Sequence, residues 1–158
     1  MSVGAGYLSN ITDSGTITDS VTDGTALPDY VPGREMHASL NNGPFTIYGG
    51  YMEAESAFQA GELAFNSVGA RPLAWNLEGT FVTEAFGKET TLAITYQAGD
   101  EALALSLPET RLGGAITFQV NPNYSATIEY LHDEDYSTSD GGTGSDGHTA
   151  TLQLAAEF

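Results

Sequence analysis

The stretch that decides the fold is residues 148–158, HTATLQLAAEF. Side chains of an extended strand point alternately to opposite faces. The even positions from 150 to 158 hold only Ala, Leu and Phe, whereas the odd positions from 149 to 157 hold Thr, Gln, Ala and Glu. Such alternation predicts a β-strand with one apolar face. The class of the protein depends on whether this face is turned into a core or outward.

The same alternation recurs along the whole chain, and no 3.6-residue period interrupts it. It predicts an all-β protein of eight antiparallel strands, at about 2–10, 33–41, 45–54, 71–83, 88–98, 109–120, 124–134 and 148–158. Most of these strands have about nine to twelve residues, close to the ~9–11 that a tilted strand needs to cross a bilayer. No apolar run reaches the roughly 18 residues of a membrane-spanning helix.

The connections between these strands alternate in length. Tight turns rich in Gly, Pro and Asn are predicted at 41–44, 84–87 and 121–123. Long polar connections lie near 11–32, 55–70, 99–108 and 135–147. This alternation is typical of an up-and-down transmembrane β-barrel, with short periplasmic turns and long outer loops. We therefore expect a single transmembrane β-barrel domain over residues 1–158, with acidic outer loops.

Aromatic residues mark both ends of the apolar face. Tyr and Trp lie toward the long connections, Phe and Tyr lie toward the short turns, and aliphatic or small residues lie between them. Aromatic rings favour the two membrane–water interfaces. We expect two lipid-facing aromatic girdles, formed by Tyr7, Phe45, Tyr51, Trp75, Phe81, Tyr96, Phe118, Tyr124, Tyr130 and Phe158.

The opposite face of the strands is polar. Inside a closed barrel its side chains can hydrogen-bond to one another and to water, whereas inside an apolar pocket they would be costly. Near the middle of the strands we predict a polar cluster in the lumen, formed by Arg111, Glu78, Glu129, Asn76 and Gln153. The alternative is a water-soluble barrel or two-sheet sandwich, in which these charges only line a solvated surface.

Composition excludes one large class of partners. The chain has 4 Lys and Arg against 21 Asp and Glu, a formal net charge of −17. Nucleic-acid binding needs cations that neutralise phosphates, so we expect no nucleic-acid partner. The expected partners are outer-membrane lipid, lipopolysaccharide bridged through divalent cations, and other copies of the chain. The sequence has no cysteine, which excludes disulfides and thiol chemistry.

The last long connection is a weak calcium candidate. GGTGSD at 141–146 matches the first six positions of a calcium-binding nonapeptide repeat, although such sites need stacked copies. The candidate ligands are the carboxylates of Asp133, Asp135, Asp140 and Asp146, since calcium prefers six to eight oxygen ligands. Runs of charge more often form a solvated surface, which is the default interpretation here.

No catalytic constellation stands out. The three histidines, His37, His132 and His148, are far apart in sequence and accompany no Ser–His–Asp order. His132 and His148 flank the last long connection and could approach each other, but we interpret them as solvated residues at the rim. We expect no enzymatic activity, no cofactor and no metal site at these histidines.

Several stretches carry a resemblance to a known family. They are GKETTLAITYQAGDEALALSLPETRLGGAITFQV at 87–120, SATIEYLHDEDYSTSDGGTGSDG at 125–147, TATLQLAAEF at 149–158, GAGYLSNITDS at 4–14 and GPFTIYGGY at 43–51. Together they resemble the C-terminal half of the LbtU-type siderophore porins of Gram-negative outer membranes. The resemblance implies an integral outer-membrane barrel for siderophore transport.

Two hypotheses about function follow. That family is understood to form a barrel of about twice the strands predicted here, and ~16–18 strands leave an aqueous channel. The chain would then be a membrane-spanning transport-type barrel or part of one. An eight-stranded barrel instead has an interior that side chains fill. The alternative is therefore a closed barrel with a structural or surface-interaction role and no open pore.

Overall fold

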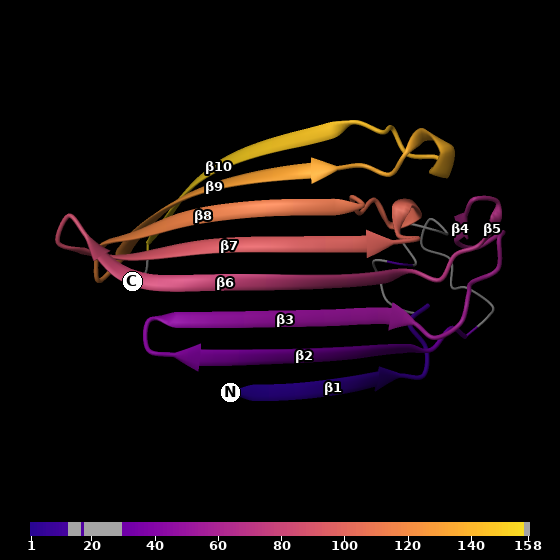
Figure 1. The fold of residues 1–158 in the computed structure, drawn as a ribbon, viewed down its shortest axis with the longest axis horizontal. Coiled ribbons are helices and arrows are strands. Elements are labelled where there is room, and N and C mark those ends of the chain that lie inside the picture. The colour runs from indigo at the N-terminus through magenta and orange to yellow at the C-terminus, as the bar shows by residue number, and fades with distance from the viewer. Residues whose placement is uncertain (13–16, 18–29, 157–158) are drawn as a thin grey trace.

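The computed structural model describes residues 1–12, 17 and 30–156, which form an all-β protein. One antiparallel sheet contains eight strands that follow one another in chain order (Figure 1). The strands are β1 (Ser2–Leu8), β2 (Gly33–Asn42), β3 (Phe45–Ala54), β6 (Leu73–Ala85), β7 (Lys88–Asp100), β8 (Thr110–Asn121), β9 (Tyr124–Glu134) and β10 (Asp146–Ala156). Short turns join the strands at one end of the sheet, and long connections join them at the other.

The eight predicted strands agree with the observed ones to within two residues at each end. The long connections contain four short elements that were not predicted from the sequence. They are the hairpin of β4 (Ala64–Phe65) and β5 (Val68–Gly69) and the 3-10 turns η1 (Leu103–Leu105) and η2 (Thr138–Asp140). Elements of two or three residues are too short to show a period. Within the described part of the chain, no helix is long and apolar enough to span a membrane.

The short turns explain why neighbouring strands keep their register. Phe86 and Gly87 both have positive φ, 56° and 69°, which suits the two-residue turn between β6 and β7. Gly43 has φ 58° at the first position of the Gly-Pro turn between β2 and β3. Register counted outward from such a turn fixes which residues share a face.

The two outermost strands of the sheet are edges. In the parts of the chain that the structure describes, β1 pairs with β2 alone and β10 pairs with β9 alone. Every residue of β10 is exposed. The sheet of eight antiparallel strands is as predicted from the sequence, whereas its closure into a barrel stays a prediction.

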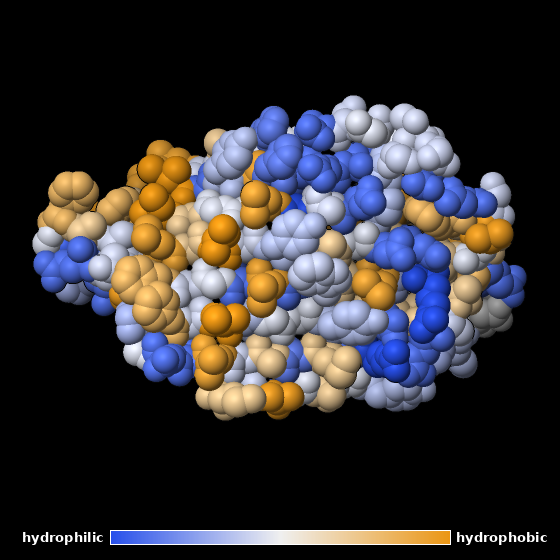
Figure 2. All heavy atoms as spheres, in the orientation of Figure 1, coloured by the Kyte–Doolittle hydropathy of each residue, from blue (hydrophilic) through white to orange (hydrophobic). Residues whose placement is uncertain are grey.

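The two faces of the sheet differ in exposure. The apolar face is the more exposed: Leu77, Ile94 and Ile128 are 52%, 61% and 57% exposed, although they lie in the middle of their strands. Their neighbours on the polar face, such as Thr95 and Glu129, are partly shielded. Figure 2 shows the exposed hydrophobic side chains over the strands, with hydrophilic ones gathered toward the long connections.

Two adjacent glycines show that the sheet bends toward its polar face. A Cβ at Gly113, on the polar face, would lie 2.7 Å from Thr95 Cγ2 and 2.8 Å from Leu131 Cδ2. A Cβ at Gly114, on the apolar face, would meet only the Ala93 carbonyl oxygen, at 3.8 Å. Side chains therefore crowd together on the polar face, which is concave, and diverge on the apolar face, which is convex.

The buried apolar side chains lie at the end of the sheet that carries the long connections. Phe58, Leu63 and Ala70 come from the connection between β3 and β6, and they pack with Val31, Ile17 and Ala54. Tyr136, from the last connection, is also buried and meets Phe65 edge to face, with ring centroids 5.6 Å apart. The long connections thus form a packed cap, whereas the sheet itself is a single layer.

Candidate functional site

The concave face carries all five residues of the predicted polar cluster: Asn76, Glu78, Arg111, Glu129 and Gln153. Strand register puts Asn76 opposite Gln97 and Gln97 opposite Arg111, and it puts Glu78 opposite Thr95. Glu129 lies opposite Thr151, and Gln153 lies opposite Thr127. The cluster therefore spans β6 to β10 as a polar surface rather than one compact network.

Arg111 forms its ion pair with Asp133 rather than with Glu78 or Glu129. Its Nε lies 2.6 Å from Asp133 Oδ1, and its Nη2 lies 2.7 Å from Oδ2. The reason is register, since Asp133 is directly opposite Arg111 on β9, whereas Glu129 is four residues farther along. Such a two-bond pair holds both side chains in a fixed geometry.

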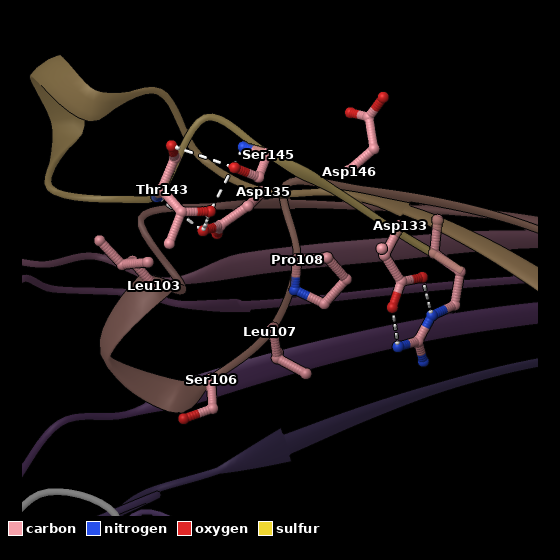
Figure 3. A pocket seen from close by; sticks show the side chains of 11 residues that line it. Leu103, Ser106, Leu107, Pro108, Asp133, Asp135, Thr143, Ser145 and Asp146 are labelled. Atoms are coloured by element: carbon pink, nitrogen blue, oxygen red, sulfur yellow. Dashed lines mark hydrogen bonds and ion pairs between the residues drawn. The ribbon is translucent and has the colours of Figure 1, made fainter. Parts of the chain in front are cut away.

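The Arg111–Asp133 pair borders a pocket beneath the long connections (Figure 3). The pocket has a volume of about 490 Å³. Apolar residues around η1 and polar residues of the last connection line it: Leu103, Leu107, Pro108, Asp135, Thr143 and Ser145. It adjoins the end of the concave face where Arg111 and Asp133 lie, and its walls are both apolar and polar.

Three of the four calcium candidates have separate partners. Asp133 is bound to Arg111, and Asp146 points away from Asp133 (Figure 3). Asp135 accepts hydrogen bonds from the Thr143 hydroxyl at 2.6 Å and the Thr143 N–H at 2.7 Å. Asp140 accepts bonds from the Ser137 hydroxyl at 2.7 Å and the Asn66 amide at 3.0 Å. Calcium binding by these four residues stays a prediction.

The hydrogen bonds to Asp135 and Asp140 also shift their acidity. Donation from the Thr143 hydroxyl, then from the Thr143 and Tyr136 N–H groups, lowers the pKa of Asp135. The Ser137 hydroxyl and the Asn66 amide lower the pKa of Asp140. Both carboxylates are therefore stabilised in their charged form, and they order the last connection.

The predicted aromatic girdles follow the apolar face. Phe45 and Phe81 stack near the short turns with ring centroids 4.7 Å apart, and Trp75 and Tyr96 meet toward the long connections at 5.4 Å. Phe158 lies outside the described residues. The remaining members, all on the described strands, are Tyr7, Tyr51, Phe118, Tyr124 and Tyr130.

Sequence reasoning missed a charged cluster around Glu53, at the long-connection end of the apolar face. The Glu53 side chain is only 8% exposed. It forms an ion pair with Arg34, lies 3.6 Å from Arg71 Nη2 through Oε2, and accepts a 2.7 Å hydrogen bond from Tyr51 Oη. Counting outward from the Gly43 turn would have paired residue 34 with residue 53. Arg71 lies just before β6, whereas it was predicted at the start of the strand at 71–83.

The structure also brings His132 and His148 together. They lie directly opposite each other on β9 and β10, with their Nδ1 atoms 3.2 Å apart. The third histidine, His37, lies on β2.

Comparison with known proteins gives relatives without a stated activity. A UPF0422 protein of Legionella pneumophila (strain Philadelphia 1) is 28% identical over 184 aligned residues, covering 99% of this chain and 35% of the relative. A UPF0422 protein of Coxiella burnetii is 27% identical over 143 residues, covering 90% of this chain and 31% of the relative. The chain spans about a third of the length of these curated relatives. No protein-family model matches it, and no solved structure does.

Proposed function

We propose that the chain is a membrane-spanning section of a bacterial outer-membrane β-barrel, with its convex apolar face toward lipid and its concave polar face toward a lumen. One observation carries this proposal. The exposed face of the sheet is apolar and the shielded face is polar, the reverse of a water-soluble sheet. In water an apolar face must be covered by a second layer, whereas in a bilayer lipid covers it.

The positions of aromatic and charged groups support the same orientation. Phe45 and Phe81 stack at one end of the apolar face, and Trp75 and Tyr96 meet at the other. Rings at both borders of an aliphatic band suit the two interfaces of a membrane. The ion pairs of Glu53 lie beyond the band, at the level of the packed cap. We infer that the long acidic connections face outward, where divalent cations would link them to lipopolysaccharide.

The edges of the sheet favour a larger pore over a closed eight-stranded barrel. Lipid does not tolerate unpaired strand edges, so β1 and β10 need partners in a membrane. We propose that further strands complete the barrel, because the curated relatives are about three times as long as this chain. In a barrel of that size the concave face would line an aqueous channel. The resemblance to siderophore porins suggests a solute of that class.

The second candidate is a closed barrel with a surface-interaction role. The observation in its favour is the packed cap, in which Phe58, Leu63 and Ala70 are almost fully buried. Outer loops that only frame a channel entrance need no such core. In this case the cap would bind a partner and the lumen would be filled.

Single-channel conductance of the refolded chain in a planar bilayer tests these alternatives. A migration shift between boiled and unboiled samples must first report a folded barrel. Stable conductance steps whose ion selectivity changes in Arg111→Glu would support a pore lined by the concave face. The matched control is Lys88→Glu, the same charge change beside a short turn. Insertion without conductance would favour the closed barrel. A chain that folds as a stable monomer in water, without detergent or lipid, would overturn the membrane proposal.

A further inference from the structure

We propose that β9 and β10 hold a divalent transition-metal ion such as Zn²⁺ between His132, Glu134, Asp146 and His148. This site is separate from the concave face. It shares Asp146, but no other residue, with the four carboxylates of the calcium candidate. It does not depend on whether the sheet belongs to a pore.

Strand register creates the site. His132 lies directly opposite His148, and Glu134 lies directly opposite Asp146. Residues two apart on a strand share a face, so the motifs His-x-Glu on β9 and Asp-x-His on β10 point all four side chains to one side. Two imidazoles and two carboxylates thus form a square of neighbours at the start of the last connection.

Three of the four groups already lie close enough to share one small ion. A nitrogen of His132 and one carboxylate oxygen each of Glu134 and Asp146 all lie within 4.8 Å of one another, and the His132 nitrogen that faces Glu134 is Nε2, 3.8 Å from Oε1. The His148 ring faces the other nitrogen of His132, Nδ1, at 3.2 Å, so it must turn to reach an ion held by Nε2. Zinc bonds of about 2.0–2.2 Å in tetrahedral geometry need ligand atoms about 3.3–3.6 Å apart. Glu134, Asp146 and His148 are exposed, so rotation of their side chains can close the remaining gaps.

Neighbouring hydroxyl groups can support the ligands from outside. The Thr110 hydroxyl donates a 2.9 Å hydrogen bond to Glu134 Oε2, which leaves Oε1 for an ion. Tyr130 Oη lies 2.8 Å from His148 Nδ1, so His148 would bind an ion through Nε2 while Tyr130 holds the other nitrogen of the ring. Hydrogen bonds to ligands from outer groups are the usual support of a metal site.

The ligand set selects a transition metal over calcium. Imidazole nitrogen suits zinc, copper and nickel, whereas calcium takes oxygen ligands. Two histidines with two carboxylates also supply four ligands, the number that a structural zinc ion takes. The ion would cross-link the edge strand β10, which is exposed at every residue, to β9. Metal binding should therefore stabilise the end of the sheet near the last connection.

The test is a titration of the refolded full chain with Zn²⁺ alone in a zwitterionic detergent, measured by isothermal titration calorimetry. We expect one ion per chain. His132→Asn and His148→Asn should each weaken zinc binding at least about tenfold. Loss of an outer-shell partner alone weakens metal binding by about 10–100-fold, and loss of a ligand should cost no less. Calcium at millimolar concentration should not displace the zinc. The matched control is His37→Asn, which removes the third histidine and should bind zinc as the unchanged chain does.

A second readout separates metal binding from loss of folding. Zinc should raise the temperature at which the folded form converts to the boiled form on a gel, and it should do so in His37→Asn but not in His132→Asn. If a histidine variant fails to fold, it shows no folded band on the gel. Glu134→Gln and Asp146→Asn are then tested in its place. Absence of saturable binding, or equal loss of binding in His37→Asn, would overturn the proposal.

Discussion

Arg111 and Asp133 face each other across β8 and β9 and join through two charge-assisted hydrogen bonds of 2.6 and 2.7 Å. Both side chains are about a third exposed or less. The pair is thus intermediate between a solvated ion pair, which contributes little, and a buried one, whose disruption is severe. The pair lies at the long-connection end of β8 and β9, not near the middle of the strands as the sequence predicted, and it ties that end to the pocket beneath the cap.

Replacing Arg111 with Met should therefore destabilise the folded sheet by about 1–3 kcal/mol, because it leaves a half-shielded carboxylate without its partner. The urea midpoint in detergent measures the change. Asp133→Asn in the same background should restore part of the loss, since the unpaired charge is then gone. Lys88→Met serves as the control, because the Lys88 ammonium only donates to the exposed Val120 carbonyl. A loss in Lys88→Met as large as in Arg111→Met would contradict this account.

A charge on the convex face distinguishes lipid from water as its surroundings. Ile94 lies in the middle of β7 and is 61% exposed. In a bilayer Ile94→Arg should cost about 2–4 kcal/mol. In water the same change at an exposed position should stay within about 0.5 kcal/mol. Equilibrium unfolding from lipid vesicles measures the difference.

Val68 offers a matched control for that substitution. It is also 61% exposed, but it lies in the hairpin of the cap. Val68→Arg should leave stability nearly unchanged in both surroundings. If Ile94→Arg proves as neutral as Val68→Arg in vesicles, the convex face does not contact lipid.

The bend of the sheet predicts opposite outcomes at two adjacent glycines. Gly113→Val puts a branched side chain against Thr95 and Leu131 on the concave face, and overpacking of this kind costs about 1–3 kcal/mol. Gly114→Val puts the same side chain on the open convex face, where it should be neutral or slightly stabilising. Thermal conversion of the folded band on gels compares the two variants. Equal losses would mean that the sheet is flat.

Most of the sheet could be predicted from the sequence because each strand repeats with period two and each short turn contains Gly, Pro or Asn. Once the turn at Gly43 is located, counting outward gives the pairing of β2 with β3. The same count would have placed Arg34 opposite Glu53, but this ion pair was not predicted.

The cap and the metal cluster depend on contacts that periodicity does not encode. Phe58 and Leu63 are buried because the connection between β3 and β6 folds back on itself, with Ala70 N–H bonded to the Leu63 carbonyl at 2.8 Å. His132 and His148 meet because the last connection returns β10 in register with β9. An irregular connection of this length does not fix its own register in the way that a two-residue turn does.

Acid should loosen the last connection through Asp135. Its folded-state pKa lies below the ordinary value of 3.8, first because of the hydrogen bond from the Thr143 hydroxyl. A lowered folded pKa means that the charged carboxylate contributes stability above the unfolded value, and that this contribution is lost as the pH falls through the lower, folded value. The Thr143 amide signal in NMR should therefore titrate below pH 3.8. Thr143→Ala should shift the midpoint upward, and Asp135→Asn should abolish the transition. A Thr143 signal that titrates unchanged in Asp135→Asn would assign the effect to another carboxylate.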